Sequence, residues 1–410
     1  MEKYQMNNGI NVVYEKIKGD ITSFSVAFDA GAIREVKDEL GLSHVVEHMI
    51  FKGTNTKNEA EINKLCDEYF GFNNAMTNYP YVVYYGTCLS EDFYKACSLY
   101  GDIIKNPTFK IEGFKEEIDV ICQELREWRD DISQFCEDEL FFNSFENRRI
   151  KDLIIGTEKS VRSFKREDVV RFYKDYYKPK NCVISVVSSL GLNKVKDMLE
   201  DIFSMWTCSD EICINPLTNL YEENRLGSFV KLKKDIETAR IQYIFPIHEL
   251  NEKEVQALRI FNAYFGEGTS SLLYDKVRTQ NGLAYEIASN IKNESGIKLF
   301  TIYAGTSKDK ITETIRLINE QICEIKKSKG VFTKNKINKL SKSIKLKRSL
   351  ALEKSIRLSL NLAVYGIMYK DAESLYKQID GIEEVDESLI IDTINKVLNN
   401  PSIQVIEPSL

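Results

Sequence analysis

The pentapeptide His44-Val45-Val46-Glu47-His48 constrains this chain more than any other feature of its sequence. It contains two of the three histidines that occur among 410 residues. In a helix, His44 and His48 project from the same face, one turn apart. That separation suits two imidazole nitrogens that bind one Zn²⁺ at about 2.0–2.1 Å. Glu47 leans toward the same face, where its carboxylate can take a proton from a water activated by the metal. The pattern therefore predicts a helix that carries a zinc site.

A catalytic zinc site takes a third protein ligand and leaves a fourth position open. The remaining histidine, His248, follows a strand-like segment and is better interpreted as a surface loop residue. A carboxylate from the segment 112–131 is the better candidate, because apolar residues recur there at helical spacing. Glu117 and Glu124 share one stripe of this helix, two turns apart, whereas Glu116 and Glu127 are harder to bring to the same point. By spacing alone, all four glutamates fit an ordinary solvated acidic face equally well.

The order H-x-x-E-H is the inverted-zincin signature. The segment 41–54, Gly-Leu-Ser-His-Val-Val-Glu-His-Met-Ile-Phe-Lys-Gly-Thr, resembles the zinc-site helix of the pitrilysin/insulinase metallopeptidases. It is most similar to the short branch that includes mitochondrial processing peptidase and its bacterial relatives. In that family the third ligand is a downstream glutamate, and another glutamate stands two helical turns before it. The resemblance therefore implies that Glu124 is the third zinc ligand and that Glu117 orients the site from outside the ligand set.

A second match lies in the segment 265–285, which resembles the signature of the family's second half. In that family an arginine and a tyrosine, seven residues apart, reach from the second domain to the zinc site, and Arg278 and Tyr285 have this spacing. A guanidinium and a phenol suit the carbonyl side of a bound peptide and the charge that develops on its oxygen. Without the resemblance, Arg278 is interpreted as a cation on a helix surface and Tyr285 as a packed strand residue.

The stretch Asn74-Ala75-Met76-Thr77 precedes an aromatic strand-like segment that begins near Pro80. It resembles the family's edge strand beside the zinc helix, where a peptide adds as an extra strand through main-chain hydrogen bonds. The resemblance thus implies that Asn74, Ala75 and Thr77 contact substrate. Pro80 is compatible with a strand start or an edge. An exposed loop that leads into a core strand explains the same residues equally well.

The composition is that of a large globular chain, with 43% apolar and 29% charged residues. A net charge of −6 argues against a general nucleic-acid-binding protein. The nine cysteines form no C-x-x-C pair and are interpreted as reduced thiols of a cytoplasmic protein. No apolar run is long enough to span a membrane, and no signal peptide is visible at the N-terminus. We therefore expect neither a nucleic-acid partner nor a membrane partner.

The pattern of strands and helices repeats after roughly 200 residues, which is consistent with two related domains. We predict an α+β fold of two homologous domains, each a mainly antiparallel sheet covered by helices. The resemblance implies that the two face each other as a clamshell. The predicted ranges are 1–206 for the zinc-binding catalytic domain, 207–225 for a linker and 226–410 for the C-terminal domain that completes the active site. Expected strands and helices include strands 21–28, 182–187, 227–233, 239–245 and 286–290 and helices 59–70, 252–265 and 272–279.

The resemblance implies a zinc-dependent endopeptidase that hydrolyses unfolded peptides or leader segments in a closed chamber, with Glu47 as the general base. The alternative is a non-catalytic scaffold or partner subunit of the same fold, and the intact set of His44, Glu47, His48 and Glu124 argues against it. A homodimer, or a heterodimer with a related subunit, is expected.

Two features leave the substrate open. The family's His-Pro element before Ile-x-Gly-Thr is replaced by Arg148–Leu153 in this chain, although Ile154–Thr157 keeps the second part. The lysine-rich stretch 326–354 is interpreted either as a solvated helical face or as a chamber lining that attracts acidic peptides.

Overall fold

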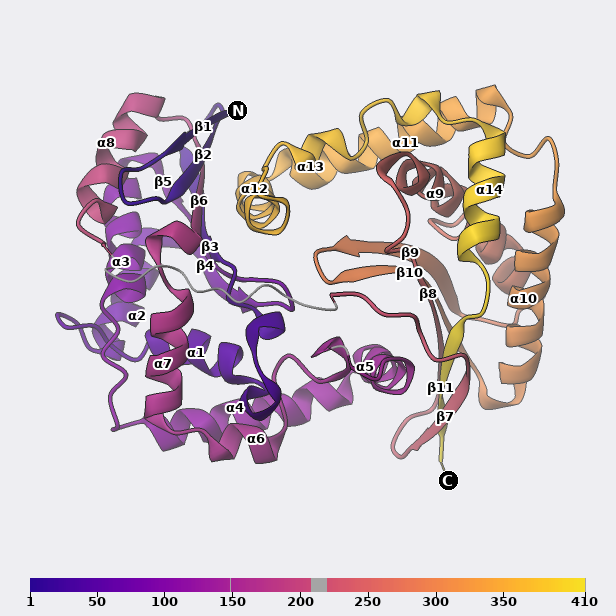
Figure 1. Ribbon diagram of the computed structural model, residues 1–410, viewed down its shortest axis with the longest axis horizontal. Coiled ribbons are helices and arrows are strands. Elements are labelled where there is room, and N and C mark those ends of the chain that lie inside the picture. Colours follow the sequence, from indigo (N-terminus) through magenta and orange to yellow (C-terminus); the bar gives the residue numbers. More distant parts are fainter. Residues whose placement is uncertain (148, 208–219, 410) are drawn as a thin grey trace. The chain divides into compact units, whose positions relative to one another are not determined.

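The computed structural model describes residues 1–147, 149–207 and 220–409 (Figure 1). Contacts divide the chain into two compact units. The first comprises Met1–Arg126, Leu153–Thr218 and Leu350–Leu375, and the second comprises Glu127–Asp152, Asn219–Ser349 and Tyr376–Leu410. Each unit therefore includes a segment from the other half of the sequence. The predicted ranges 1–206 and 226–410 are continuous and do not include these segments. Most of the predicted linker 207–225 lies outside the described residues.

The first unit is built on a six-stranded sheet with the order β1-β2-β6-β3-β5-β4. All neighbouring strands are antiparallel except β2 and β6, which are parallel. The strands are β1 (Glu2–Gln5), β2 (Asn11–Lys16), β3 (Ile21–Phe28), β4 (Phe70–Thr77), β5 (Val82–Leu89) and β6 (Cys182–Ser188). Its helices are α1 (Leu42–Ile50), α2 (Glu59–Tyr69), α3 (Phe93–Lys105), α4 (Phe114–Asp130), α6 (Glu158–Ser163), α7 (Arg166–Tyr176), α8 (Leu192–Phe203) and α12 (Ser355–Tyr369).

Both faces of this sheet are covered, which explains why β3 and β6 are buried along almost their whole length. Phe24, Val26 and Phe28 of β3 point into the main core, formed with α1, α3 and α7. The alternate residues face α12, which lies on the opposite side of the sheet (Figure 1). There the hydroxyl of Ser25 lies 2.9 Å from that of Ser359. Small residues on both elements allow the helix to approach the strands closely.

The second unit repeats this plan with a five-stranded sheet in the order β7-β11-β8-β10-β9, in which only β7 and β11 are parallel. The strands are β7 (Gly227–Lys233), β8 (Ala239–Pro246), β9 (Glu286–Glu294), β10 (Ile297–Thr306) and β11 (Ser402–Pro408). The helices are α5 (Ile132–Ser144), α9 (Glu252–Phe265), α10 (Ile311–Lys327), α11 (Lys334–Glu353), α13 (Ser374–Lys377) and α14 (Glu387–Val397).

The core of the second unit lies between one face of its sheet and α9, α10 and α14. The other face is covered in part by α5, which packs on β11 and β8 (Figure 1). The side-chain amide of Asn143 on α5 donates a hydrogen bond of 2.8 Å to Oε1 of Gln404 on β11. Helix α5 thus has the same place on the second sheet that α12 has on the first.

The predicted fold class is confirmed as α+β, with two similar halves of sheet and helices. Strand 21–28, strand 227–233 and helix 252–265 have the predicted bounds, and most other elements differ by a few residues at their ends. The segment predicted as an α-helix over 272–279 differs in kind, because residues Tyr274–Gln280 form a π-helix. Among the described residues, no helix is both long enough and apolar enough to cross a membrane.

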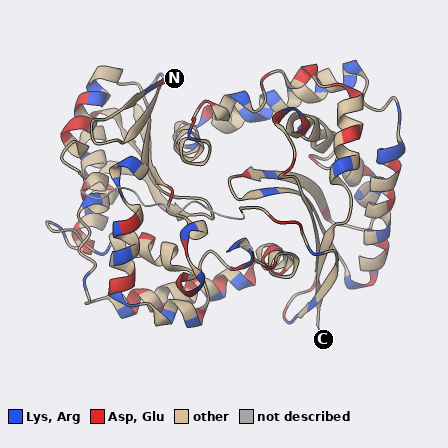
Figure 2. Cartoon of the chain, viewed as in Figure 1, with Lys and Arg blue, Asp and Glu red and all other residues tan. Residues whose placement is uncertain are grey.

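Charged residues lie mainly along the helices, whereas the strands of both sheets carry few (Figure 2). Most of the lysine-rich stretch forms α11. Two of its lysines are neutralised by acids of the second unit: Lys345 lies 2.6 Å from Glu383 and Lys347 lies 2.7 Å from Glu267. These pairs agree with the solvated-face interpretation, and a role in attracting acidic peptides stays a prediction.

The close packing of α12 on the first sheet can be tested at Gly366. A Cβ atom at this position would lie 2.9 Å from Cγ1 of Val183 on β6. We expect Gly366→Val to lower the stability of the first unit by about 1–3 kcal/mol, the usual cost of overpacking a core. Differential scanning calorimetry measures the effect. Gly191→Ala is the matched control, because no atom lies within 4 Å of a Cβ there. Equal melting curves for Gly366→Val and the wild type would contradict this packing.

Candidate metal centre

Helix α1 is fixed at its first turn by a buried carboxylate and a close backbone contact. Glu35 accepts hydrogen bonds from the main-chain N–H groups of Gly41, at 2.9 Å, and Ser43, at 2.8 Å. A carboxylate in this place accepts from N–H groups that have no partner within the helix. Its negative charge is also stabilised by the positive N-terminal end of the helix dipole. Gly41 has φ of +93°, and a Cβ atom there would lie 2.5 Å from the carbonyl oxygen of Ile155. The retained Ile-x-Gly-Thr element therefore packs directly against the start of the zinc-motif helix.

The rest of α1 places its apolar residues in the core, while His44 is buried and Glu47 and His48 are partly buried. Leu42, Val45, Val46 and Met49 are fully buried. His44 and His48 lie side by side one turn apart, with their ring centroids 4.6 Å from each other. The predicted helix and the predicted pairing of the two imidazoles are therefore both present.

The two histidines converge on Glu124 of helix α4. Nε2 of His48 lies 3.4 Å from Oε2 of Glu124, and Nε2 of His44 lies 3.7 Å from Oε1. The three donor atoms all lie within 4.8 Å of one another. Ligand atoms about 3.3–3.4 Å apart are expected around a tetrahedral zinc ion with bonds of about 2.0–2.1 Å. The donor set and its spacing therefore fit zinc, with only small movements needed.

Glu117 orients His48 from the side away from this centre. Its Oε1 lies 2.8 Å from Nδ1 of His48, and its other oxygen pairs with Lys52. A carboxylate on Nδ1 places the proton there and leaves the lone pair of Nε2 available to a metal ion. Burial alone favours the neutral form of Glu117, but hydrogen bonds from His48 and Lys52 outweigh it and lower the pKa of the carboxyl group. Glu117 is therefore ionised in its buried position.

The pKa values of the two imidazoles are shifted in opposite directions. Burial, and secondly the neighbouring His48, lowers the pKa of His44 to about 4. Burial also opposes charge on His48, but hydrogen bonds to Glu117 and Glu124 prevail and raise its pKa to about 9. His44 is therefore neutral at pH 7, whereas His48 is protonated and would release a proton if its Nε2 bound a metal.

Glu47 lies beside a small cavity, and its carboxylate is hydrogen-bonded to Thr77. Its Oε2 accepts from the hydroxyl of Thr77 at 2.6 Å. Burial raises the pKa of Glu47, which brings this carboxyl group closer to neutral pH as a proton acceptor. The cavity, of about 280 Å³, is lined by Glu47, His48, Phe51, Lys52, Glu59, Asn73, Asn74, Ala75 and Glu117.

Strand β4, which carries Thr77, forms one end of the first sheet. Its residues Asn74, Ala75 and Thr77 pair with β5 on one side only. Between the two interpretations of this segment, the structure therefore favours an edge strand over a loop. That these three residues bind substrate stays a prediction.

Arg278 and Tyr285 belong to the second unit. Arg278 lies on the π-helix, where its guanidinium stacks on the ring of Tyr274 at 4.6 Å from the centroid and donates to its hydroxyl. Tyr285 precedes β9, and 43% of it is exposed. The predicted action of both residues at the zinc site stays a prediction. His248 lies in the loop between β8 and α9, as expected, with its ring stacked on Tyr221.

Sequence comparison agrees with this geometry. Residues 11–158 match the family model described as insulinase (peptidase family M16), and residues 163–343 match the model described as the peptidase M16 inactive domain. The chain belongs to peptidase family M16. The insulinase model spans the described centre completely, because His44, His48 and Glu124 all lie between residues 11 and 158.

Similar proteins from other organisms match most of the chain. A protein of Rickettsia felis described as an uncharacterized zinc protease is 27% identical, over 97% of this chain and 94% of the relative. A probable beta subunit of the mitochondrial-processing peptidase of Arabidopsis thaliana is 24% identical, over 97% of this chain and 76% of the relative. The crystal structure of a protease from Helicobacter pylori superposes with a TM-score of 0.89, at 21% identity and over 99% of both chains, which supports the fold.

Sequence reasoning did not identify the contacts that three residues make in the centre, although it predicted that Thr77 contacts substrate. Glu35 caps α1, Lys52 pairs with Glu117, and the Thr77 hydroxyl holds Glu47. None of them has a periodic spacing to its partner, since the contacts arise from tertiary packing. Of the three, Lys52 had the clearest signal in the sequence, because it is a cation one helical turn after His48.

The metal centre predicts the effect of removing one imidazole. His48→Ala deletes a ligand and also the partner of Glu117, so we expect the purified variant to lose its zinc, which should be about one ion per wild-type chain. Atomic absorption measures the content. His248→Ala is the matched control and should keep its zinc, because that residue stacks on Tyr221 instead. A zinc content in His48→Ala equal to that of the wild type would contradict the assignment.

Proposed function

We propose that this M16 protein is a zinc-dependent endopeptidase in which Glu47 acts as the general base. The observation that carries the proposal is the position of Glu47, beside both the zinc donors and the cavity at edge strand β4. A base must lie within reach of the proton that it takes, and its raised pKa suits work near neutral pH. The names of relatives described as zinc proteases support the same activity.

The chain's own groups have separate tasks in this reaction. His44, His48 and Glu124 would hold the zinc ion, which when bound supplies a Lewis acid that polarises a carbonyl group and acidifies water. The carboxylate of Glu47, whose Oε2 accepts from Thr77, would receive the proton of the attacking water. Glu47 then holds this proton and gives it to the leaving amine. Glu117 keeps Nδ1 of His48 protonated throughout.

We propose an unfolded peptide or a leader segment as the substrate. Edge strand β4 offers main-chain donors and acceptors to an extended peptide, which would add as a further strand next to Asn74, Ala75 and Thr77. Recognition of this kind uses the peptide backbone and therefore tolerates many side chains. The likeness to a mitochondrial-processing peptidase subunit supports a role in trimming peptides.

In the second unit, Arg278 and Tyr285 complete the proposed site. The phenol of Tyr285 would donate a hydrogen bond near the scissile carbonyl, and this bond strengthens as negative charge builds on the oxygen. Arg278 would bind the carbonyl side of the same peptide, after leaving its stacked position on Tyr274. Closure of the second unit over the substrate would expel water from the reaction.

A non-catalytic scaffold of the same fold is the second candidate. It is favoured by the name of the model that matches residues 163–343, the peptidase M16 inactive domain. That range begins after the zinc donors, however, and the donors lie in the range that matches the insulinase model. A chain that keeps the donor atoms of His44, His48 and Glu124 within 4.8 Å of one another, with Glu47 beside His48 at the same cavity, fits the enzyme better.

We further propose a cytoplasmic protein that pairs with itself or with a related subunit. The seven cysteines among the described residues are all unpaired, and six of them are buried, which suits a reducing compartment. The processing-peptidase relative is named as a beta subunit, which supports assembly with a partner.

Glu47→Gln separates the base from the metal ligands. The amide keeps the size of the side chain but cannot accept the proton, so we expect normal zinc content and a kcat lower by at least roughly 10²-fold. Cleavage of a quenched fluorescent peptide measures the rate. Glu59→Gln, which alters another acid at the same cavity, is the control and should cut at nearly the wild-type rate. Wild-type turnover by Glu47→Gln would leave this carboxylate without a catalytic role.

Tyr285→Phe tests the contribution of the second unit. We expect unchanged zinc content and melting temperature, with kcat/KM lower by roughly 10- to 1000-fold, the range for loss of one stabilising donor. Tyr303→Phe removes the hydroxyl of a tyrosine of similar exposure on the neighbouring strand β10 and is the control. If Tyr285→Phe and Arg278→Ala both cleave at the wild-type rate, the proposed roles of these residues are wrong.

A further inference from the structure

A row of three residues crosses the second sheet next to Tyr285. Gly305 on β10 is directly opposite Glu286 on β9 and directly opposite Arg240 on β8. Residues opposite each other in antiparallel strands have their side chains on the same face of the sheet. Arg240 and Glu286 therefore stand on either side of a place where Gly305 contributes no side chain.

The ring of Tyr285 occupies this empty place. A Cβ atom at Gly305 would lie 2.4 Å from Cζ and from the hydroxyl oxygen of Tyr285. The main-chain N–H of Tyr285 also donates to the carbonyl oxygen of Gly305 at 3.0 Å. The backbone of Gly305 is not in the left-handed region, so the conformation does not require glycine. The requirement is space for the phenol.

Arg240 holds this phenol from the side. Its guanidinium carbon lies 5.1 Å from the centroid of the Tyr285 ring, a cation–π contact. Nη1 of Arg240 donates to the hydroxyl oxygen of Thr238 at 3.1 Å, and the Tyr285 hydroxyl donates to the same oxygen at 3.2 Å. The guanidinium of Arg240 thus contacts the ring of Tyr285 directly and holds its hydroxyl through the shared partner Thr238.

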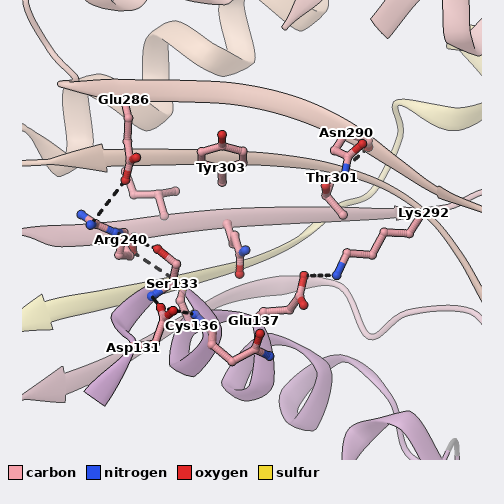
Figure 3. A pocket seen from close by; sticks show the side chains of 13 residues that line it. Asp131, Ser133, Cys136, Glu137, Arg240, Glu286, Asn290, Lys292, Thr301 and Tyr303 are labelled. Carbon is pink, nitrogen blue, oxygen red and sulfur yellow. Dashed lines mark hydrogen bonds and ion pairs between the residues drawn. The ribbon is translucent and has the colours of Figure 1, made fainter. Parts of the chain in front are cut away.

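The guanidinium is itself fixed by two other elements (Figure 3). Its Nη2 lies 3.4 Å from Glu286, and its Nε donates to the hydroxyl of Ser133 on α5 at 3.3 Å. Only 16% of the Arg240 side chain is exposed. The network borders a polar cavity of about 390 Å³ between α5 and the open face of β8, β9 and β10. An arginine held in this way has little freedom to move, and neither has the ring that stacks on it.

We propose that Arg240 is the positioning residue for Tyr285 and that Gly305 forms the seat of its ring. The proposal rests on the proposed function, in which the Tyr285 phenol acts on the peptide carbonyl. A phenol that is held in advance loses less entropy when it meets the transition state, and a donor displaced by about 1 Å can cost 10²-fold in rate. Arg278 does not position the phenol of Tyr285 in the observed arrangement, since its guanidinium stacks on Tyr274.

The first test replaces the guanidinium. Arg240→Gln should lower kcat by about 10- to 100-fold, with a much smaller change in KM, because the phenol is misplaced while substrate binding continues. Arg240→Lys keeps the charge and should recover part of the loss. Lys292→Gln is the matched control, because this cation lines the same cavity but pairs with Glu137 at 2.5 Å. An equal loss in Lys292→Gln would mean a general effect of cavity charge and would overturn the proposal.

A double-mutant cycle then asks whether Arg240 acts through Tyr285. In a Tyr285→Phe background, Arg240→Gln should cause little further loss, since the group that it positions is gone. Gly305→Ala should lower kcat in the wild type by filling the seat, and it should be silent in a Tyr285→Ala background, where the seat is vacant. Zinc content and melting temperature identify variants that fail to fold. Full additivity in both cycles would overturn the proposal.

Fluorine NMR of 3-fluorotyrosine incorporated at position 285 distinguishes this proposal from the proposed function. Arg240→Gln and Gly305→Ala should shift or broaden the resonance, and Lys292→Gln should leave it unchanged. If these shifts appear while Tyr285→Phe cleaves peptides at the wild-type rate, the positioning stands and the catalytic role of Tyr285 fails. An unchanged resonance in both Arg240→Gln and Gly305→Ala would overturn the positioning itself.

Discussion

The hydrogen bond between Glu117 and Nδ1 of His48 joins the two helices that carry the candidate metal centre. It spans 2.8 Å between α4 and α1, and both partners are largely buried. The bond fixes which nitrogen of His48 faces outward, and by the helical repeat it also fixes Glu124, two turns further along α4. Lys52 holds the other oxygen of Glu117, so the carboxylate is ionised although it is buried. The convergence of His44, His48 and Glu124 depends on this contact.

The sequence was most informative where chemistry and local geometry coincide. His44 and His48 share a helical face through their spacing alone, so the pair and its helix follow from the pentapeptide. The proposed third ligand is different, because Glu117 and Glu124 share one stripe of α4 and only the family resemblance selects Glu124. In the folded chain, the packing of α4 against α1 determines which glutamate lies next to the two histidines. No short sequence pattern encodes packing of this kind. Glu35 and Thr77 were not identified as partners in the site for the same reason.

The exchange of segments between the units also depends on long-range packing. Helices α5 and α12 have ordinary helical sequences, and nothing local indicates which sheet each will cover. Their effect is visible in the strands instead. Ser25 on β3 would suit a solvated face, yet it is buried and pairs with Ser359 of α12. Alternation of small polar and large apolar residues in a strand is therefore compatible with burial on both faces.

In both sheets, missing side chains are as important as those present. Gly366 and the serines beneath α12 allow a helix to approach β3 and β6, and Gly305 leaves room for the ring of Tyr285. The result in the second unit is an exposed phenol that is nevertheless held by Thr238 and Arg240. A residue held in this way is suited to work on a substrate, because its own ordering is complete before the substrate arrives.

The central claim is that zinc is held by two imidazoles and one carboxylate, and X-ray absorption at the zinc K edge tests it most directly. The protein, loaded with one equivalent of zinc, should show two imidazole nitrogens and oxygen scatterers at about 2.0–2.1 Å, with no sulfur at about 2.3 Å. Glu124→Gln should change the oxygen shell and leave the imidazole signal. Because the chain has nine cysteines, sulfur ligation is the natural rival. A zinc–sulfur shell, or a spectrum without imidazole, would contradict this account.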